Sequence, residues 1–408
     1  MGRGTGRRKG AERLPNVPRQ RRPLAAPRAT VNILYDLSLL GFCRDDPAKI
    51  TGMPRVLIEQ GARLRTTPGC NVEFCAAEDA PEAQEFARRH PAFAAAPFAD
   101  VAGPGVLAGA DVFHTPHSAV PDAARTHGRL AVVQTIYDMI PFLLTETMTA
   151  EYREYYADIV RRLRPTDRVV TISQSAKDDF CGYAGFPAER VHVVPLAASR
   201  ELFYQCADEG RIAAVREKYR VGPGPYLLSV CTFEPRKNLE HVIRSFVALA
   251  GSGQADELRL VLAGGKGWMF EPILAELAGT AALRERIVTT GYVDDADLAP
   301  LYSGAMAFLY LSRYEGFGLP PLEAMQCGTP VVASNTSSLP EVVGEAGVLL
   351  GPDDRDGLCQ AMLDLHRDPA RRAALAERSL ARAGRFSWEE NVRQTVEVYR
   401  LAAAERGS

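Results

Sequence analysis

Two glutamates stand eight positions apart in the stretch YEGFGLPPLEAM, residues 314–325. Pro320 and Pro321 prevent one continuous helix here, since proline lacks an N–H group and disfavours a helical conformation in the residue before it. We therefore expect Glu315 in a loop, Pro321 at the first helical position and Glu323 in the first turn. A helix N-terminus favours an anion, and the carboxylates could hold the hydroxyls of a sugar or ribose attached to it. The alternative is a surface loop with a capping glutamate.

A second informative stretch is CTFEPRKNLEHVI, residues 231–243, where a strand is expected to end and a helix to begin. Arg236 and Lys237 stand side by side at that junction. A guanidinium fork and a flexible ammonium beside free backbone N–H groups are suited to a diphosphate. A solvated basic turn is the alternative. However, this stretch and the glutamate stretch both follow strands of one expected domain, and together they predict a site for a nucleoside diphosphate sugar.

The elements that must position these residues follow a repeating pattern. Short apolar runs alternate with amphipathic stretches from Val31 onward, which is typical of parallel strands covered by helices on both faces. The alternation restarts after a polar stretch at residues 200–222, so we expect an α/β protein with two doubly wound domains. Ser175 and Ser387 are expected to cap helices. Ligands of such sheets bind at the carboxyl ends of the strands, so the cleft between the two domains is the expected site.

Composition limits the remaining possibilities. The chain has 408 residues, is 46% hydrophobic and carries a formal net charge of −2, so its body has no general attraction for nucleic acid. Residues 1–29, rich in arginine, are expected to form a disordered basic tail, either inert or in contact with anionic lipid or nucleic acid. The eight cysteines lack metal-ligand spacing and no run of about twenty apolar residues occurs, which predicts a cytoplasmic protein. Peripheral contact with the inner face of the membrane remains open.

The chain resembles the retaining glycosyltransferases of family 4, which have the GT-B fold of two facing Rossmann-like domains. In the second half the likeness rests on LSVCTFEPRKNLEHVIRSF, LVLAGGKGW, YLSRYEGFGLPPLEAMQCGTPVVASNTSSLPEVVGEAG and FSWEENVRQTVEVY. In the first half TGMPRV, TIYDMIPF and VVTISQSAKDDF are similar in order and spacing. The resemblance implies an acceptor domain at 30–205, a nucleotide-sugar donor domain at 206–385, and a C-terminal helix at 386–408 that packs back toward the first domain.

The resemblance also implies roles for individual residues. Arg236 and Lys237 would bind the diphosphate and stabilise it as it leaves. Glu315 would hold the donor sugar and Glu323 the hydroxyls of the nucleoside ribose. Tyr137 and Asp138 are expected to contribute to catalysis, and Asp36 to contact the acceptor. Further donor contacts are expected from Gly52, Arg55, Tyr292, Phe317, Gly318 and Leu319.

Two features qualify this expectation. The family commonly has histidine at the position of Tyr137, and a tyrosine can donate a hydrogen bond but cannot take a positive charge. The stretches DAD (295–297) and DDRD (353–356) resemble the metal site of the other large glycosyltransferase fold. We expect both to cap helices, because Arg236 and Lys237 already supply the positive charge. No metal and no cofactor are therefore expected.

These observations predict a metal-independent, retaining hexosyltransferase that uses a nucleotide sugar and a glycan or lipid-linked acceptor. GDP-mannose is the first candidate donor, since EPRKN and YEGFGLPPLEAM most resemble the mannosyltransferase versions of these motifs. UDP-glucose and UDP-N-acetylglucosamine remain open. An NAD-dependent oxidoreductase is disfavoured because GGKG (264–267) lacks the G-x-G-x-x-G spacing. A non-catalytic sugar-nucleotide binding protein is disfavoured by the intact set of two acids and two bases.

Overall fold

The computed structural model describes residues 30–406, apart from residues 47, 48, 79, 102, 104 and 284. The expected basic tail at residues 1–29 lies outside the described residues, so its disorder stays a prediction. Within the described part of the chain, every helix is too short or too polar to cross a lipid bilayer.

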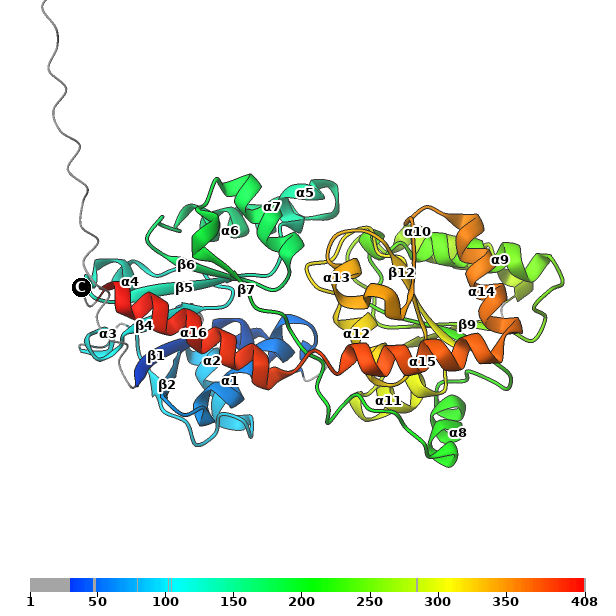
Figure 1. Cartoon of the computed structure of the whole chain (residues 1–408), viewed down its shortest axis with the longest axis horizontal. Helices are drawn as coiled ribbons and strands as arrows, with labels where there is room; N and C mark the ends of the chain where they lie inside the picture. Colours follow the sequence, from blue (N-terminus) through cyan, green and yellow to red (C-terminus); the bar gives the residue numbers. More distant parts are fainter. Residues whose placement is uncertain are drawn as a thin grey trace, which may run out of the picture.

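The first sheet has seven parallel strands in the order β3-β2-β1-β4-β5-β6-β7 (Figure 1). They are β1 (Val31–Asp36), β2 (Cys70–Cys75), β3 (Phe98–Ala99), β4 (Val112–Thr115), β5 (Ala131–Ile136), β6 (Arg168–Thr171) and β7 (Val191–Val193). The strands β4, β5 and β6 are buried along their whole length, as expected for strands covered on both faces. The strand order reverses between β1 and β4, which is where doubly wound sheets bind ligands.

The second sheet has six parallel strands in the order β10-β9-β8-β11-β12-β13. They are β8 (Tyr226–Val230), β9 (Arg259–Ala263), β10 (Ile287–Gly291), β11 (Ala307–Tyr310), β12 (Val331–Ser334) and β13 (Val348–Leu350). Here the order reverses between β8 and β11. The loops that follow these two neighbouring strands carry the predicted basic pair and the first predicted glutamate.

Helices separate the strands in both domains. In the first domain they are η1 (Ser38–Cys43), α1 (Met53–Thr66), α2 (Ala80–Arg89), α3 (Val106–Gly109), α4 (Asp122–Thr126), α5 (Ile140–Leu143), η3 (Thr145–Thr147), α6 (Ala150–Arg161), α7 (Gln174–Ala184) and η4 (Ala188–Arg190). In the second part of the chain they are α8 (Glu209–Lys218), η5 (Pro235–Lys237), α9 (Leu239–Gly251), α10 (Glu271–Ala278), η6 (Ala281–Leu283), α11 (Asp295–Ser303), α12 (Leu319–Gln326), α13 (Leu339–Val343), η7 (Gly344–Ala346), α14 (Arg355–Arg367), α15 (Pro369–Ala383) and α16 (Trp388–Arg406).

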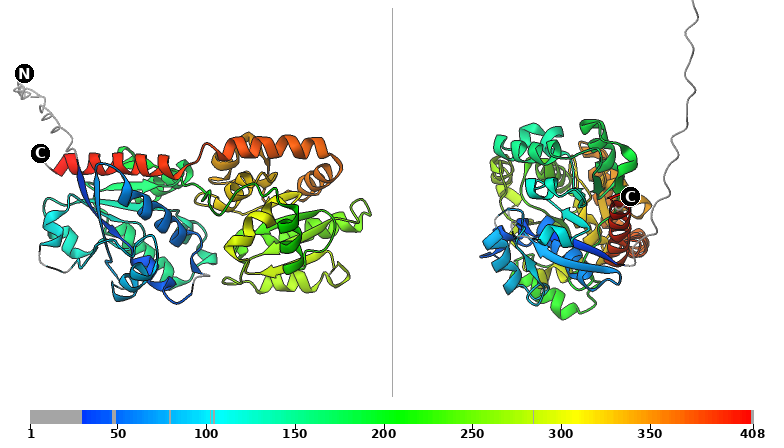
Figure 2. Two further views of the ribbon diagram at one scale, coloured as in Figure 1. Left: turned by 90° about the horizontal axis from the view of Figure 1, so that it is seen from below. Right: turned by 90° about the vertical axis from the view of Figure 1, so that its left-hand side faces the viewer.

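The two sheets belong to separate lobes that lie side by side (Figures 1 and 2). After α15 the chain crosses back, and α16 packs against α1 and β5 of the first lobe. The predicted α/β architecture of two doubly wound domains is confirmed.

Helix capping agrees with the sequence at one of the two expected serines. Ser387 precedes α16, and its Oγ accepts a hydrogen bond from the backbone N–H of Glu390 at 3.1 Å, as predicted. The prediction for Ser175 is wrong, because Ser173 caps α7 by accepting from the N–H of Ala176 at 3.0 Å. Ser173 keeps an extended backbone directly after β6 (φ −151°, ψ 164°), so the helix begins earlier than expected.

A buried polar seam holds α16 on the first domain. The Tyr399 hydroxyl lies 2.6 Å from Nδ1 of His114, whose Nε2 lies 2.9 Å from the Thr135 hydroxyl. Nearby, the Gln60 side-chain amide donates to Oδ1 of Asn391 on α16 at 2.8 Å. Burial lowers the pKa of His114 to about 3, so the ring is neutral and each of its nitrogens has one partner.

We expect Tyr399→Phe to lower the free energy of unfolding by about 1–3 kcal/mol, because it leaves a buried nitrogen of His114 without a partner. Urea unfolding at pH 7, followed by circular dichroism, measures this. Tyr183→Phe is the matched control, since Tyr183 is 55% exposed on α7 and its hydroxyl is available to water. Equal losses in the two variants would contradict the role of the seam.

The stability of the protein should fall as the pH drops below 6.5. Burial lowers the pKa of His114 to about 3 and that of His117 to about 4, and burial with the nearby Arg168 lowers that of His192 to about 4. Between pH 6.5 and 4 each of these histidines therefore binds its proton mainly in the unfolded chain, which costs about 1.4 kcal/mol per pH unit for each of them. The carboxyls of Glu323 and Asp138, whose pKa values are raised by burial, act in the opposite direction but are fewer. Thermal unfolding midpoints measured from pH 7.5 to pH 5 should decline, and a flat profile would contradict this account.

Candidate active site

A cavity of about 1070 Å³ lies between the domains, at the carboxyl ends of both sheets. Elements of both domains contribute to its walls. Twelve of the thirteen predicted site residues line it: Gly52, Arg55, Tyr137, Asp138, Arg236, Lys237, Tyr292, Glu315, Phe317, Gly318, Leu319 and Glu323. The thirteenth, Asp36, does not.

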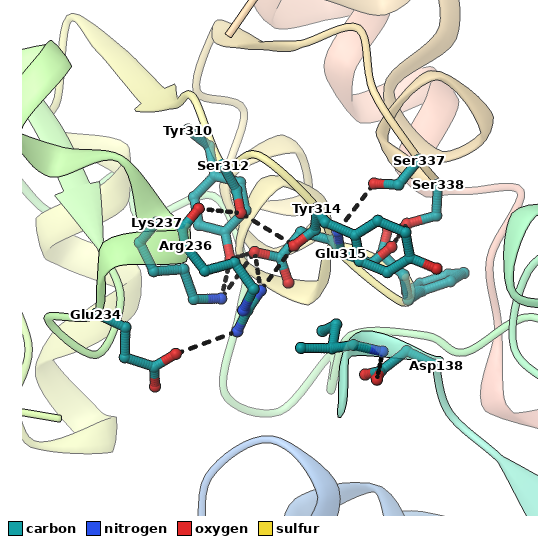
Figure 3. A network of polar contacts seen from close by, with 12 residues as sticks. Asp138, Glu234, Arg236, Lys237, Tyr310, Ser312, Tyr314, Glu315, Ser337 and Ser338 are labelled. Atoms are coloured by element: carbon teal, nitrogen blue, oxygen red, sulfur yellow. Dashed lines mark hydrogen bonds and ion pairs between the residues drawn. The ribbon is translucent and has the colours of Figure 1, made fainter. Parts of the chain in front are cut away.

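At the centre of the site, the basic pair converges on the first glutamate (Figure 3). Oε1 of Glu315 lies 2.8 Å from Nη1 of Arg236 and 2.8 Å from Nζ of Lys237. The three side chains are only about a tenth exposed, so the charges face one another away from bulk water. Burial raises the pKa of the Glu315 carboxyl, but Arg236 and Lys237 outweigh it and hold that pKa at about 2. Glu315 is therefore a carboxylate at neutral pH.

Tyr310, the last residue of β11, completes this centre. Its hydroxyl accepts a hydrogen bond from Nζ of Lys237 at 2.8 Å and donates to Oε1 of Glu315 at 2.9 Å. The prediction from sequence omitted Tyr310, because it stands inside an apolar strand. A tyrosine at the carboxyl end of a strand, beside a candidate site, is the signal that could have identified it.

The backbone of the Glu315 loop is held by two serines that the sequence analysis also omitted. Ser337 Oγ accepts from the N–H of Glu315 at 2.8 Å. Ser338 Oγ lies 2.8 Å from the carbonyl oxygen of Glu315 and 2.7 Å from that of Phe317, to which it donates. Both serines immediately precede α13, where serine commonly bonds to nearby backbone groups.

The helix that carries the second glutamate starts earlier than predicted. α12 begins at Leu319, so Pro320 and Pro321 both lie in its first turn and Glu323 lies one turn further along. The expectation of Pro321 at the first helical position was wrong. Proline is tolerated throughout the first turn, because the N–H groups it lacks there have no intrahelical partner.

Glu323 lies in a second, less charged corner of the cavity. The Tyr302 hydroxyl donates to its Oε2 at 3.2 Å. Burial raises the pKa of the Glu323 carboxyl to about 7, and the nearby Arg55 opposes that rise. A half-buried carboxyl with one protein donor has further capacity to bond hydroxyl groups of a ligand.

Arg55 joins the two domains across this corner. Its Nη2 lies 2.6 Å from Oδ1 of Asp295, which comes from the first turn of α11. Its guanidinium also lies over the ring of Phe203, 5.8 Å from the centroid. Arg55 was predicted to add charge for the donor, and in this structure its charge is balanced by Asp295.

Gly52 forms the N-terminus of α1 at the cavity wall. Its φ of 53° is a left-handed value that side chains disfavour, although a methyl group there would meet no atom within 4 Å. Backbone conformation, and not crowding, therefore explains the glycine in this structure. The open space beside it belongs to the cavity.

Tyr137 and Asp138 directly follow β5. Asp138 approaches the Glu315 loop from the other domain (Figure 3). Oδ1 of Asp138 accepts from the N–H of Ile140 at 2.9 Å. Burial raises the pKa of Asp138 and that of Tyr137, so the tyrosine hydroxyl stays protonated. A methyl group on Gly316 would lie 2.5 Å from the carbonyl oxygen of Tyr137, so only glycine allows the two loops to approach this closely.

Asp36 lies away from the cavity wall, within the first domain. It is fully buried, and its carboxylate accepts from the N–H and hydroxyl of Ser38, the N–H of Ala77 and the hydroxyl of Thr115, at 2.5–3.1 Å. These bonds join the loops after three neighbouring strands. Asp36 therefore stabilises the ends of these strands and does not line the cavity, and its contact with an acceptor stays a prediction.

The aspartate-rich stretches form a helix cap and ion pairs. Asp354 caps α14, accepting from the N–H of Gly357 at 2.8 Å, as predicted. In the DAD stretch, Asp295 pairs with Arg55, and Asp297 lies 2.6 Å from Nζ of Lys218. These are ion pairs in the first turn of α11, so the predicted capping by side chains is not found there.

Two family models match this chain, one in each domain. The model "Glycosyltransferase Family 4" matches residues 50–201, and "Glycosyl transferases group 1" matches residues 212–382. Anabaena HepE in complex with UDP has a similar structure, with a TM-score of 0.67 at 18% identity over 90% of this chain and 98% of HepE. That likeness concerns the fold, and it confirms the predicted GT-B arrangement.

Relatives with greater sequence identity are also found. The O-antigen chain mannosyltransferase B of Escherichia coli is 33% identical over 291 residues, which are 71% of this chain and 74% of that protein. The serotype-specific mannosyltransferase WbdA of Escherichia coli is 31% identical over 265 residues, which are 64% of this chain and only 32% of WbdA. With both domain models matched and a relative covered over most of its length, the chain belongs to the family 4 glycosyltransferases.

Proposed function

We propose that the protein transfers a hexose, with mannose as the first candidate, from a nucleoside diphosphate sugar to a glycan acceptor, with retention and without a metal ion. The observation that carries this proposal is the convergence of Arg236 and Lys237 on Glu315 in the interdomain cavity. Two cations and an acid at one point suit a ligand that joins a diphosphate to a sugar.

The cationic pair supplies stabilisation of the leaving group. When the bond from the sugar to the diphosphate breaks, negative charge grows on the phosphate oxygens. Arg236, Lys237 and the backbone N–H groups of Phe317, Gly318 and Leu319, at the start of α12, line the same cavity and would take up that charge. These cations stabilise the negative charge that a metal ion stabilises in other enzymes. We therefore propose that the reaction requires no metal ion.

Glu315 would orient the sugar, and Glu323 the ribose. Glu315 remains ionised beside its two cations and accepts hydrogen bonds from sugar hydroxyls. Glu323, in its less charged corner, bonds the ribose hydroxyls. Asp138 and Tyr137 approach from the other domain, so the sugar lies between groups of both domains. In the proposed retaining reaction the acceptor hydroxyl attacks the face from which the diphosphate departs and passes its proton to a departing phosphate oxygen.

The donor sugar and base are argued from the relatives. The two Escherichia coli proteins are named mannosyltransferases, which supports mannose. The O-antigen name of the first supports a polysaccharide acceptor. HepE is described in complexes with UDP and UDP-glucose, which favours a UDP-sugar as the second candidate.

We expect Lys237→Ala and Glu315→Gln each to lower the transfer rate about a hundredfold or more, because each removes one charge from the centre that stabilises the reacting groups. Release of nucleoside diphosphate from the sugar nucleotide measures the rate, and thermal unfolding checks that the fold is kept. Lys218→Ala is the matched control, since Lys218 lies on α8 with a side chain 51% exposed. If Lys237→Ala turned over at the unmodified rate, the proposed mechanism would be wrong.

GDP-mannose should raise the thermal unfolding midpoint more than UDP-glucose or UDP-N-acetylglucosamine at equal concentration, because a ligand stabilises the folded state according to its affinity. GDP and UDP alone, in the same panel, separate recognition of the base from recognition of the sugar. Stronger stabilisation by UDP and a UDP-sugar would replace mannose transfer with the second candidate. No shift with any member of the panel would count against the proposed function itself.

A further inference from the structure

The two domains also meet beside the cavity, along a line of contacts that we name the α7 seam. On the second-domain side, the seam is made by the loop that carries Glu315 and by α13. On the first-domain side, it is made by the N-terminal turns of α7. Its members are Ser173, Gln174, Ser175, Asp179, Tyr314, Gly316 and Glu341.

Glu341, on α13, binds the start of α7. Its Oε2 accepts from the backbone N–H of Gln174 and its Oε1 from that of Ser175, both at 2.7 Å. The first N–H groups of a helix have no partner within the helix, and the helix dipole favours a negative charge there. A carboxylate of one domain thus satisfies two donors of the other in a bidentate arrangement.

Two further contacts tie the same helix to the Glu315 loop. The Ser173 hydroxyl, which caps α7, donates to the carbonyl oxygen of Gly316 at 2.7 Å. The Tyr314 hydroxyl donates to the carboxylate of Asp179, one turn into the helix. Tyr314 and Gly316 flank Glu315, so α7 holds the loop on both sides of Glu315.

The seam is continuous with the groups that fix Glu315. Ser337 and Ser338, which bond the backbone on both sides of Glu315, precede Glu341 by only a few residues. One short segment of the second domain therefore holds both Glu315 and α7.

On the first-domain side, α7 follows β6, and Tyr137 and Asp138 follow β5. These strands are neighbours in register, with Ile136 opposite Thr171. Gly316 contacts the segments that follow both strands. Its carbonyl oxygen accepts a hydrogen bond from the Ser173 hydroxyl, and its Cα faces the carbonyl oxygen of Tyr137 and the Cβ of Asp138. Movement of α7 away from α13 would therefore also separate Asp138 from Glu315.

We propose that Glu341 is a positioning residue of the transfer reaction, which fixes the Tyr137–Asp138 loop of one domain against Glu315 of the other by binding the first two N–H groups of α7. This inference rests on the proposed function. The groups proposed for the diphosphate and ribose all belong to the second domain. Loss of the seam should therefore leave nucleotide binding intact and reduce only the fraction of molecules in the reactive arrangement.

The test compares Glu341→Ala, Glu341→Gln and the matched control Glu345→Ala, which removes an exposed carboxylate from η7. For Glu341→Ala we expect kcat to fall about tenfold or more while the donor KM changes by less than about threefold. The kcat of Glu341→Gln should lie between that of Glu341→Ala and that of the unmodified protein, because the amide oxygen of the glutamine can still accept a hydrogen bond from one N–H group. Asp179→Ala, which breaks the seam from the other side, should show the same separation of kcat from KM, and Glu345→Ala should match the unmodified protein.

Calorimetric titration with GDP and with UDP in parallel gives the fraction of each variant that binds nucleotide. A stoichiometry near one, with an unchanged Kd and a lowered kcat, supports positioning. A reduced stoichiometry in Glu341→Ala would assign Glu341 to folding alone and overturn the inference, as would an unchanged kcat with full binding. If the unmodified protein neither binds nucleotide nor turns over sugar nucleotide, the proposed function fails instead, and this result is distinct from the other two.

Discussion

The architecture of the site depends on one buried carboxylate. Glu315 is withdrawn from water, and an isolated charge there would cost several kcal/mol unless it is compensated. Arg236 and Lys237, supplied by a loop 78 residues earlier in the chain, provide that compensation, and the Tyr310 hydroxyl completes the group. Two loops that differ in sequence and origin are thereby held in one arrangement before any ligand arrives.

Sheet topology explains how those loops meet. β8 and β11 are neighbours in the second sheet, at the point where the strand order reverses, and parallel strands all end at the same edge. The residues that follow the two strands must therefore lie side by side. The same rule in the first sheet brings the ends of β5 and β6 to the opposite wall of the cavity. Each sheet thus fixes the positions of the site residues in its own domain. The strand order does not determine how the two domains contact each other.

That contact is made by small and polar groups. Gly316 allows two backbones to approach, Arg55 and Asp295 pair across one corner, and Glu341 binds α7 at the other. Polar contacts of this kind between domains are modest in free energy. The attachment of α16 to the first domain is different in kind, since His114 and Tyr399 are fully buried and hydrogen-bonded to each other.

The sequence by itself determined the alternation of strands and helices, the division into two doubly wound domains, and the identity of the acids and bases, because periodicity and loop chemistry are local properties. It did not determine where α7 and α12 begin, since the competing caps and prolines differ by only a residue or two in position. Only the tertiary structure decided that Asp36 supports neighbouring loops, that Tyr310 joins Lys237 to Glu315, and that Glu341 meets α7. Arg55 and Asp295 are 240 residues apart, and no local pattern records which distant residue will lie opposite a given side chain once the sheets have formed.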